Sequence, residues 1–299
     1  MGNNPKISSG IKNAADLGIK ADSMGILKRK AKTHKGRKIM ESKEAKLIED
    51  LKKSIIMKGM KTSQTVMDLM KDLHLQRGTD LSKLFLRTGK DLHPFDDIGP
   101  IEQMANKQGS ALFVLGTHQK KRPDNIIFGR MFAEHLLDMF EFGVTGYVSQ
   151  KEFKSMEVTN NLKPILIFQG EQFDFNDKHR RFKNYLIDFF KVSDYEEVNI
   201  AELKRVMVFT SVGEKTIHHK QFEINVGKQV NITDVTNNTI SMHEIGPRYT
   251  LNVRRDKIAT IELYKEACKQ PKIGNFESRK AAKNMYTNNF GEKMGKVYL

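Results

Sequence analysis

Hydrophobic positions follow two kinds of spacing along the chain, and together they predict a mixture of helices and strands. Apolar side chains that recur every three or four residues predict helices at about 42–58, from Ser63 to Gly78, and at about 101–106, 133–140, 177–190 and 257–269. Short apolar or alternating runs predict strands at 81–86, 111–115, 126–128, 144–149, 163–168, 203–210, 216–226, 230–234, 240–243 and 248–255. Ser63 is a favourable N-cap and Gly78 a typical helix end, so the second helix has the clearest boundaries.

The order of these elements predicts an α+β fold made of two halves. Helices with strands come first, another helix with strands follows, and the division lies near 150–162. Each half contains a strand motif with glycine and arginine, Gly129-Arg130 in the first and Gly246-Pro247-Arg248 in the second. There is no clean sequence repeat, so any symmetry between the halves is weak at the level of sequence.

Positive charge is concentrated at the two ends of the chain. The net charge is +15, with ten Lys and Arg against two acids in residues 1–40 and eight against three in residues 265–299. The rest of the chain has 33 against 31 and is nearly neutral. Basic ends favour arms that grip a polyanion. We therefore predict a basic arm over 1–39 that is disordered when free, a folded domain over 40–270 with halves of about 40–155 and 156–270, and a basic tail over 271–299.

The densest basic patch runs from Lys28 to Lys38. Seven of its eleven residues are lysine or arginine. Such a run is typical of a nuclear import signal, an RNA-binding arm, or both. A tail that only improves solubility is the alternative interpretation.

A second basic group lies inside the folded part of the chain. Lys120, Lys121 and Arg122 are followed by Pro123 and are flanked by the predicted strands 111–115 and 126–128. A turn between strands faces solvent, and proline fixes its own φ, so we expect three cations displayed together on a stiff support. A solvated charged turn without a partner is the alternative.

The stretch from Gly116 to Arg130 and the stretch from Glu244 to Arg255 together resemble the signature of the Brix family of ribosome-assembly proteins. Within that family, residues 89–97 and 290–298 are similar to one member that acts on the large ribosomal subunit. The resemblance extends over roughly residues 27 to 299. It implies a Brix domain of two pseudo-symmetric, interlocked α/β halves, with basic N- and C-terminal extensions.

The same resemblance implies a function and a set of partners. We expect a non-enzymatic assembly factor of the nucleus and nucleolus that binds large-subunit rRNA and recruits the 5S ribonucleoprotein particle. The implied partners are 5S rRNA, the ribosomal proteins of the 5S particle, and the regulator of ribosome synthesis protein as a heterodimer partner. A Brix-type factor acting on another precursor, an RNA-processing enzyme and a pure protein scaffold are the alternatives.

The sequence shows no constellation of residues that would support catalysis or a cofactor. His218 and His219 are adjacent, so on a strand they point to opposite faces and cannot share a metal. Cys268 is the only cysteine, which excludes an internal disulfide, and we expect it to fill a small space in the core. No run of eighteen apolar residues is present, so we expect no membrane partner.

Phosphate contacts come mainly from lysine and arginine, and they set affinity without reading sequence. Aromatic residues are mostly phenylalanines at core-like positions, such as Phe182, Phe189 and Phe190, so contact with a structured RNA backbone is expected before base stacking. The predicted RNA contacts are Lys28, Arg29, Lys30, Lys32, Lys35, Arg37, Lys38, His118, Lys120, Lys121, Arg122, Arg130, Arg248, Arg254, Arg255, Lys272, Arg279, Lys280 and Lys283.

Overall fold

A computed structural model describes residues 19–21, 27–29, 33–37, 51–87, 92–153, 163–192, 204–226, 240–268, 286–287 and 293–294. The chain divides into two compact units, one of Asp50–Tyr264 and one of Met1–Glu49 with Lys265–Leu299. In the second of these units, β1 (Ile19–Ala21) pairs antiparallel with β2 (Leu27–Arg29), and β13 (Tyr286–Thr287) pairs antiparallel with β14 (Lys293–Met294).

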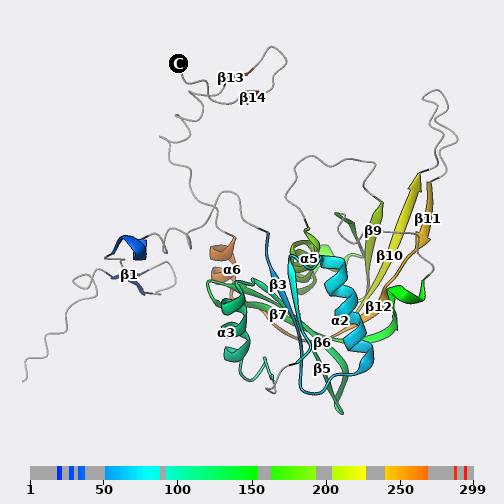
Figure 1. Cartoon of the computed structure of the whole chain (residues 1–299), viewed down its shortest axis with the longest axis horizontal. Coiled ribbons are helices and arrows are strands. Elements are labelled where there is room, and N and C mark those ends of the chain that lie inside the picture. Colours follow the sequence, from blue (N-terminus) through cyan, green and yellow to red (C-terminus); the bar gives the residue numbers. More distant parts are fainter. Residues whose placement is uncertain are drawn as a thin grey trace, which may run out of the picture. The chain divides into compact units, whose positions relative to one another are not determined.

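The unit Asp50–Tyr264 is built on one mixed sheet, which has ten strands among the described residues (Figure 1). Its order is β4-β3-β5-β6-β7-β12-β10-β9-β8, and β11 pairs with β10. Strand β3 runs parallel to β4 and β5, β8 runs parallel to β9, and the other pairs are antiparallel. The strands are β3 (Ser54–Lys58), β4 (Ser82–Phe85), β5 (Leu112–Gln119), β6 (Arg122–Phe132), β7 (His135–Val148), β8 (Ile165–Gln169), β9 (Arg205–Val212), β10 (Thr216–Val226), β11 (Ile240–Glu244) and β12 (Arg248–Lys257).

The helices are α2 (Gln64–Arg77), α3 (Gly99–Gln108), α4 (Gln172–Phe175), α5 (Asp177–Phe190) and α6 (Ile261–Ala267), with a 3₁₀ turn at Gln150–Glu152. The predicted ends of α2 are confirmed, because the Ser63 side chain accepts from the Val66 N–H and the Gly78 N–H donates to His74 and Leu75. The predicted bounds of α5 are confirmed, and the Asn176 side chain caps it by accepting from the Lys178 N–H.

Apolar residues cover both faces of the sheet. On one face, Phe128 and Phe142 pack against α2 and α5, and the predicted core positions Phe182, Phe189 and Phe190 are all buried there. On the other face, Phe113, Leu115, Ile127 and Met139 pack against Ile101 and Ala105 of α3. We call these the α2/α5 face and the α3 face. Ile126 and Ile127 enter different cores, as the alternation of side chains along a strand requires.

The predicted helix at 42–58 is wrong where the structure describes it, because Ser54–Lys58 forms strand β3. Ile55, Ile56 and Met57 are consecutive and have no exposed surface. A parallel strand covered on both faces has a continuous apolar run, and this run coincided with a helical spacing. Residues 42–50 of the prediction lie outside the described part of the chain.

The predicted helix at 133–140 is also wrong. Ala133 and Glu134 form a tight turn with φ of 50° and 73°, and His135–Val148 continues as one long strand, which contains the predicted strand 144–149 except for its last residue. Two-residue hairpin turns with positive φ at both positions usually contain glycine or asparagine. Neither is present here, so the sequence has no turn signal at this point.

The remaining predictions fall into three groups. The strands predicted at 81–86, 111–115, 126–128, 163–168, 203–210, 216–226, 240–243 and 248–255 are confirmed with small shifts, as is the helix at 101–106. The last helix is shorter than predicted, and Cys268 is exposed and not a core residue. The predicted strand 230–234 lies outside the described residues, and the domain limits and the symmetry of the halves stay predictions.

Candidate nucleic-acid interface

The predicted basic turn is a hairpin tip. Lys120 and Lys121 form the turn between β5 and β6 and are exposed, while Arg122 begins β6 and is half-buried. His118 belongs to β5 of the same hairpin, and its Nδ1 accepts from the Asp124 N–H at 3.2 Å and lies 3.4 Å from the Asp124 carboxylate. The two lysines therefore project from a paired strand end, as the sequence predicted.

The second basic motif reaches the same region from β12. A regular strand points neighbouring residues to opposite faces, but the pairing of β12 with β7 shifts register between Val253 and Arg255. Arg254 donates to Asn125 Oδ1 at 2.8 Å and to the Pro123 carbonyl at 2.7 Å. The irregularity thus lets two consecutive arginines, Arg254 and Arg255, lie on the α3 face.

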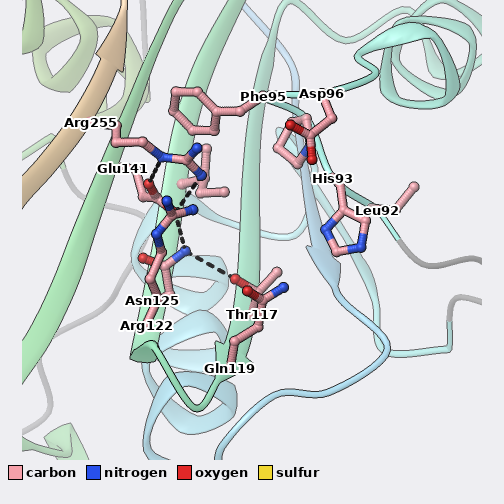
Figure 2. A pocket seen from close by; sticks show the side chains of 12 residues that line it. Leu92, His93, Phe95, Asp96, Thr117, Gln119, Arg122, Asn125, Glu141 and Arg255 are labelled. Atoms are coloured by element: carbon pink, nitrogen blue, oxygen red, sulfur yellow. Dashed lines mark hydrogen bonds and ion pairs between the residues drawn. The ribbon is translucent and has the colours of Figure 1, made fainter.

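Glu141 of β7 is the centre of this group, with a side chain only 1% exposed. Its carboxylate accepts from Arg255 Nε and Nη2 and from Asn125 Nδ2 at 2.8 Å, and Arg122 Nη1 lies 3.6 Å away (Figure 2). We call Arg122, Asn125, Glu141, Arg254 and Arg255 the arginine cluster. It joins residues from the two Brix-like stretches, which are far apart in the sequence.

The cluster has three guanidinium groups and one carboxylate, and of the three arginines only Arg122 and Arg255 contact Glu141, so the arginine cluster is electropositive. The side chains of Arg122 and Arg255 are 38% and 36% exposed. Each guanidinium has five N–H donors, more than Glu141 can accept, so donors remain for a phosphate. Arg254 is also half-buried, and burial lowers its pKa, with the Glu141 carboxylate opposing that effect.

Gly143 makes the position of Arg254 possible. A Cβ at residue 143 would lie 2.6 Å from Arg254 Nη2 and 2.9 Å from its Cζ. Since real Cβ atoms do not approach that closely, any other residue there would push the guanidinium away from Asn125. The close packing of Arg254 against the sheet therefore requires glycine at 143.

A cavity of about 280 Å³ lies beside the arginine cluster. Thr117, Gln119 and Arg122 line one side, and the loop at 92–96 lines the other (Figure 2). The Phe95 ring lies 3.8 Å from Arg255 Cζ, a cation–π contact that holds the guanidinium in place. The cavity therefore has a largely polar lining that includes the exposed guanidinium groups of Arg122 and Arg255 beside Asp96 and Glu141, and it has room for a ligand larger than water.

The other predicted contacts of this unit lie elsewhere. Arg130 is 12% exposed on its side chain and forms an ion pair with Asp188 of α5 at 2.9 Å, so it belongs to the α2/α5 face. Arg248 lies at the opposite end of β12, 3.5 Å from Glu244 and 5.9 Å from the Phe153 ring. Both have partners within the protein, and their contact with RNA stays a prediction.

The structure places the predicted contacts of the basic ends only in part. Lys28 and Arg29 lie in β2, and Lys35 and Arg37 are exposed in a helical turn at 34–37. The predicted contacts that lie outside the described residues are Lys30, Lys32, Lys38, Lys272, Arg279, Lys280 and Lys283.

Sequence reasoning missed three residues of the site, namely Glu141, Asn125 and Phe95. A signal existed for Glu141, because a carboxylate between Phe140 and Phe142 within a buried strand must have cationic partners. Its partners come from β6 and β12, which the sequence alone does not place beside β7.

Among the described residues, no group of three or more His, Cys, Asp or Glu could hold a metal. His219 is buried between the rings of Phe209 at 4.6 Å and Tyr249 at 4.5 Å, and burial lowers its pKa to about 3. His218 is half-buried, with its Nδ1 2.8 Å from Thr250 Oγ1. No helix in the described part of the chain is long and apolar enough to cross a membrane.

Comparison with known proteins places this fold in a family. Residues 59–255 match the Brix domain, a range that contains the whole arginine cluster. The chain is 35% identical to the ribosome production factor 2 homolog of Drosophila melanogaster over 277 residues, which is 92% of this chain and 84% of that protein. It is 34% identical to the homolog of Homo sapiens over 269 residues, 89% of this chain and 84% of that protein.

A relative with lower sequence identity is also named for ribosome biogenesis. The ribosome biogenesis protein RPF2 of Saccharomyces cerevisiae is 28% identical over 277 residues, 90% of this chain and 79% of that protein. The matches cover most of both chains in each case. The chain therefore belongs to the Brix-domain family and, within it, to the group of ribosome production factor 2 proteins.

Proposed function

We propose that this chain is an assembly factor for the large ribosomal subunit that binds rRNA and recruits the 5S ribonucleoprotein particle into pre-ribosomes. The names of its relatives, which refer to ribosome production and ribosome biogenesis, support the general role. The observation that carries the RNA-binding part is the arginine cluster, where two motifs of the Brix domain converge on one buried carboxylate.

The arginine cluster is suited to a phosphate backbone. Arginine forms paired N–H bonds to phosphate oxygens, and here Glu141 fixes the orientation of Arg255 before any ligand arrives. Lys120 and Lys121 extend the charge from the hairpin tip. Because such contacts read charge and shape, binding would depend strongly on salt and weakly on sequence.

The role assigned to the protein is adhesion without catalysis. The basic arms would neutralise further phosphates, while the Asp50–Tyr264 unit would hold a heterodimer partner, the regulator of ribosome synthesis protein. 5S rRNA, large-subunit rRNA and the ribosomal proteins of the 5S particle complete the proposed set of partners. The nucleus and the nucleolus are the compartments in which this assembly would occur.

Affinity purification of the full chain from nuclei, followed by sequencing of the bound RNA, tests the proposal. We expect 5S rRNA together with large-subunit precursors. Recovery of small-subunit precursors without 5S rRNA would contradict the assignment and favour a Brix-type factor that acts on another precursor.

A further inference from the structure

A second cavity of about 280 Å³ lies on the α2/α5 face of the sheet. Its apolar floor consists of Phe140, Phe142, Ile217 and Val253, and its rim includes the first residues of α5. Arg255 lines this cavity as well as the one beside the arginine cluster. The two cavities therefore flank the same end of β12, one on each face.

His179 gives this cavity a specific chemical character. The residue lines the cavity and is only 4% exposed, and neither of its ring nitrogens has a hydrogen-bond partner. A buried polar group without a partner is unfavourable, so this position favours an occupant that satisfies it. Burial lowers the pKa of His179, with Glu214 opposing the effect, so the ring is neutral and offers one donor and one acceptor.

The rim around His179 carries both positively and negatively charged side chains. Lys178 forms an ion pair with Asp256 at 2.7 Å, and Lys215 and Glu214 lie on the turn before β10. The N-terminus of α5 adds the positive end of a helix of 14 residues. Glu214 and Asp256 therefore line the cavity together with Lys178, Lys215, Arg254 and Arg255, so charged donors and acceptors lie together around an apolar floor.

A flat apolar ring with donors and acceptors along its edge fits this combination. Nucleobases have this chemistry, and RNA-binding proteins recognise unpaired bases by apolar packing and hydrogen bonds to the base edge. We propose that the cavity at the N-terminus of α5 accepts one unpaired nucleobase of the RNA whose backbone lies on the arginine cluster. The inference rests on the proposed RNA binding and adds that the protein prefers RNA with an unpaired nucleotide.

The test uses RNA hairpins of one stem sequence, either fully paired or with a single unpaired A, G, C or U. At fixed salt, the full chain should bind at least one of the bulged hairpins about tenfold more tightly than the paired hairpin, because a packed base is worth roughly 1–3 kcal/mol. His179→Phe keeps the ring but removes both nitrogens. This variant should bind all the hairpins equally, with a melting temperature no lower than that of wild type.

A second measurement does not depend on any variant. The ring signals of His179 in NMR spectra of the wild-type chain should shift when the preferred bulged hairpin is added and stay in place with the paired hairpin. Equal binding of all hairpins by wild type would overturn the inference while leaving RNA binding intact. Binding of none would overturn both proposals, and a His179 signal that moves only with a lysine-rich peptide would overturn the inference by assigning the cavity to a protein segment.

Discussion

Arginines occupy two kinds of place in this protein, and the comparison separates structural charge from charge available to a ligand. Arg77 of α2 has no exposed surface and donates to the main-chain carbonyls of Lys52 and Asp188, while the Phe189 ring lies 4.9 Å from its Cζ. In the arginine cluster, Arg122 and Arg255 are at least a third exposed and share the single carboxylate of Glu141.

The difference lies in what the donors contact. Fixed main-chain carbonyls accept from both Nη groups of Arg77, and burial lowers its pKa to about 10, which still leaves it charged at neutral pH. The cluster has more donors than its carboxylate can accept, and the surplus faces a cavity. Interior arginines therefore hold elements together, whereas the cluster holds cations ready for a polyanion.

The largest effect is expected at the interior site. Arg77→Ala would leave two buried carbonyls without donors and open a cavity, so the free energy of unfolding should fall by about 3–5 kcal/mol. Denaturation in urea measures this loss, and Arg87→Ala, at an exposed position, is the matched control with an expected change within about 0.5 kcal/mol. RNA affinity measured below the melting temperature should equal that of wild type. A tenfold loss would show that this interior arginine also contributes to RNA binding, which contradicts the comparison.

A second test concerns the buried histidine His219 in the same unit. His219 has its pKa lowered by burial from 6.5 to about 3, so between these values the unfolded chain binds a proton that the folded protein does not. Stability should therefore fall as pH falls through this window, by up to about 1.4 kcal/mol for each pH unit. His219→Phe, which keeps a ring between Phe209 and Tyr249, should remove this part of the dependence. Equal slopes for both proteins in urea denaturation at several pH values would show that His219 does not carry it.

The smallest change in stability is expected at Gly143, where one substitution tests an arginine of the cluster without removing it. Gly143→Ala should displace the end of the flexible Arg254 side chain and break its bonds to Asn125 and Pro123. The gain in strand propensity offsets part of that loss, so stability should change by no more than about 1 kcal/mol. RNA affinity should nevertheless fall severalfold in a filter-binding or anisotropy titration. Unchanged affinity would remove Arg254 from the interface.

The sequence predicted the parts of this site that depend on local chemistry. The hairpin tip at Lys120 and Lys121 follows from two apolar runs around a basic turn, and the ends of α2 follow from Ser63 and Gly78. The meeting of Arg122 with Arg255 depends on β7 lying between β6 and β12, which is a long-range pairing. The register shift that brings Arg254 and Arg255 to one face leaves no signature in composition or spacing.

The errors have physical causes of the same kind. A buried parallel strand such as β3 has no alternation to distinguish it from a helix, and the turn at Ala133 and Glu134 has positive φ without glycine. In both places the tertiary environment decided the structure. Arg130 shows the same limit for function, since its ion pair with Asp188 could not be foreseen from the motif that contains it.

The salt dependence of RNA binding tests the central claim most directly. In a chain with Lys120→Ala, Lys121→Ala and Arg122→Ala, the slope of log affinity against log salt should become shallower by roughly 0.7 to 0.9 for each phosphate that the variant no longer neutralises, about equally for RNAs of different sequence. A control chain with alanine at the exposed Lys107, Lys204 and Lys220 should keep the wild-type slope. A triple variant with an unchanged slope and a lowered melting temperature would contradict the account, because these residues would then stabilise the fold without touching RNA.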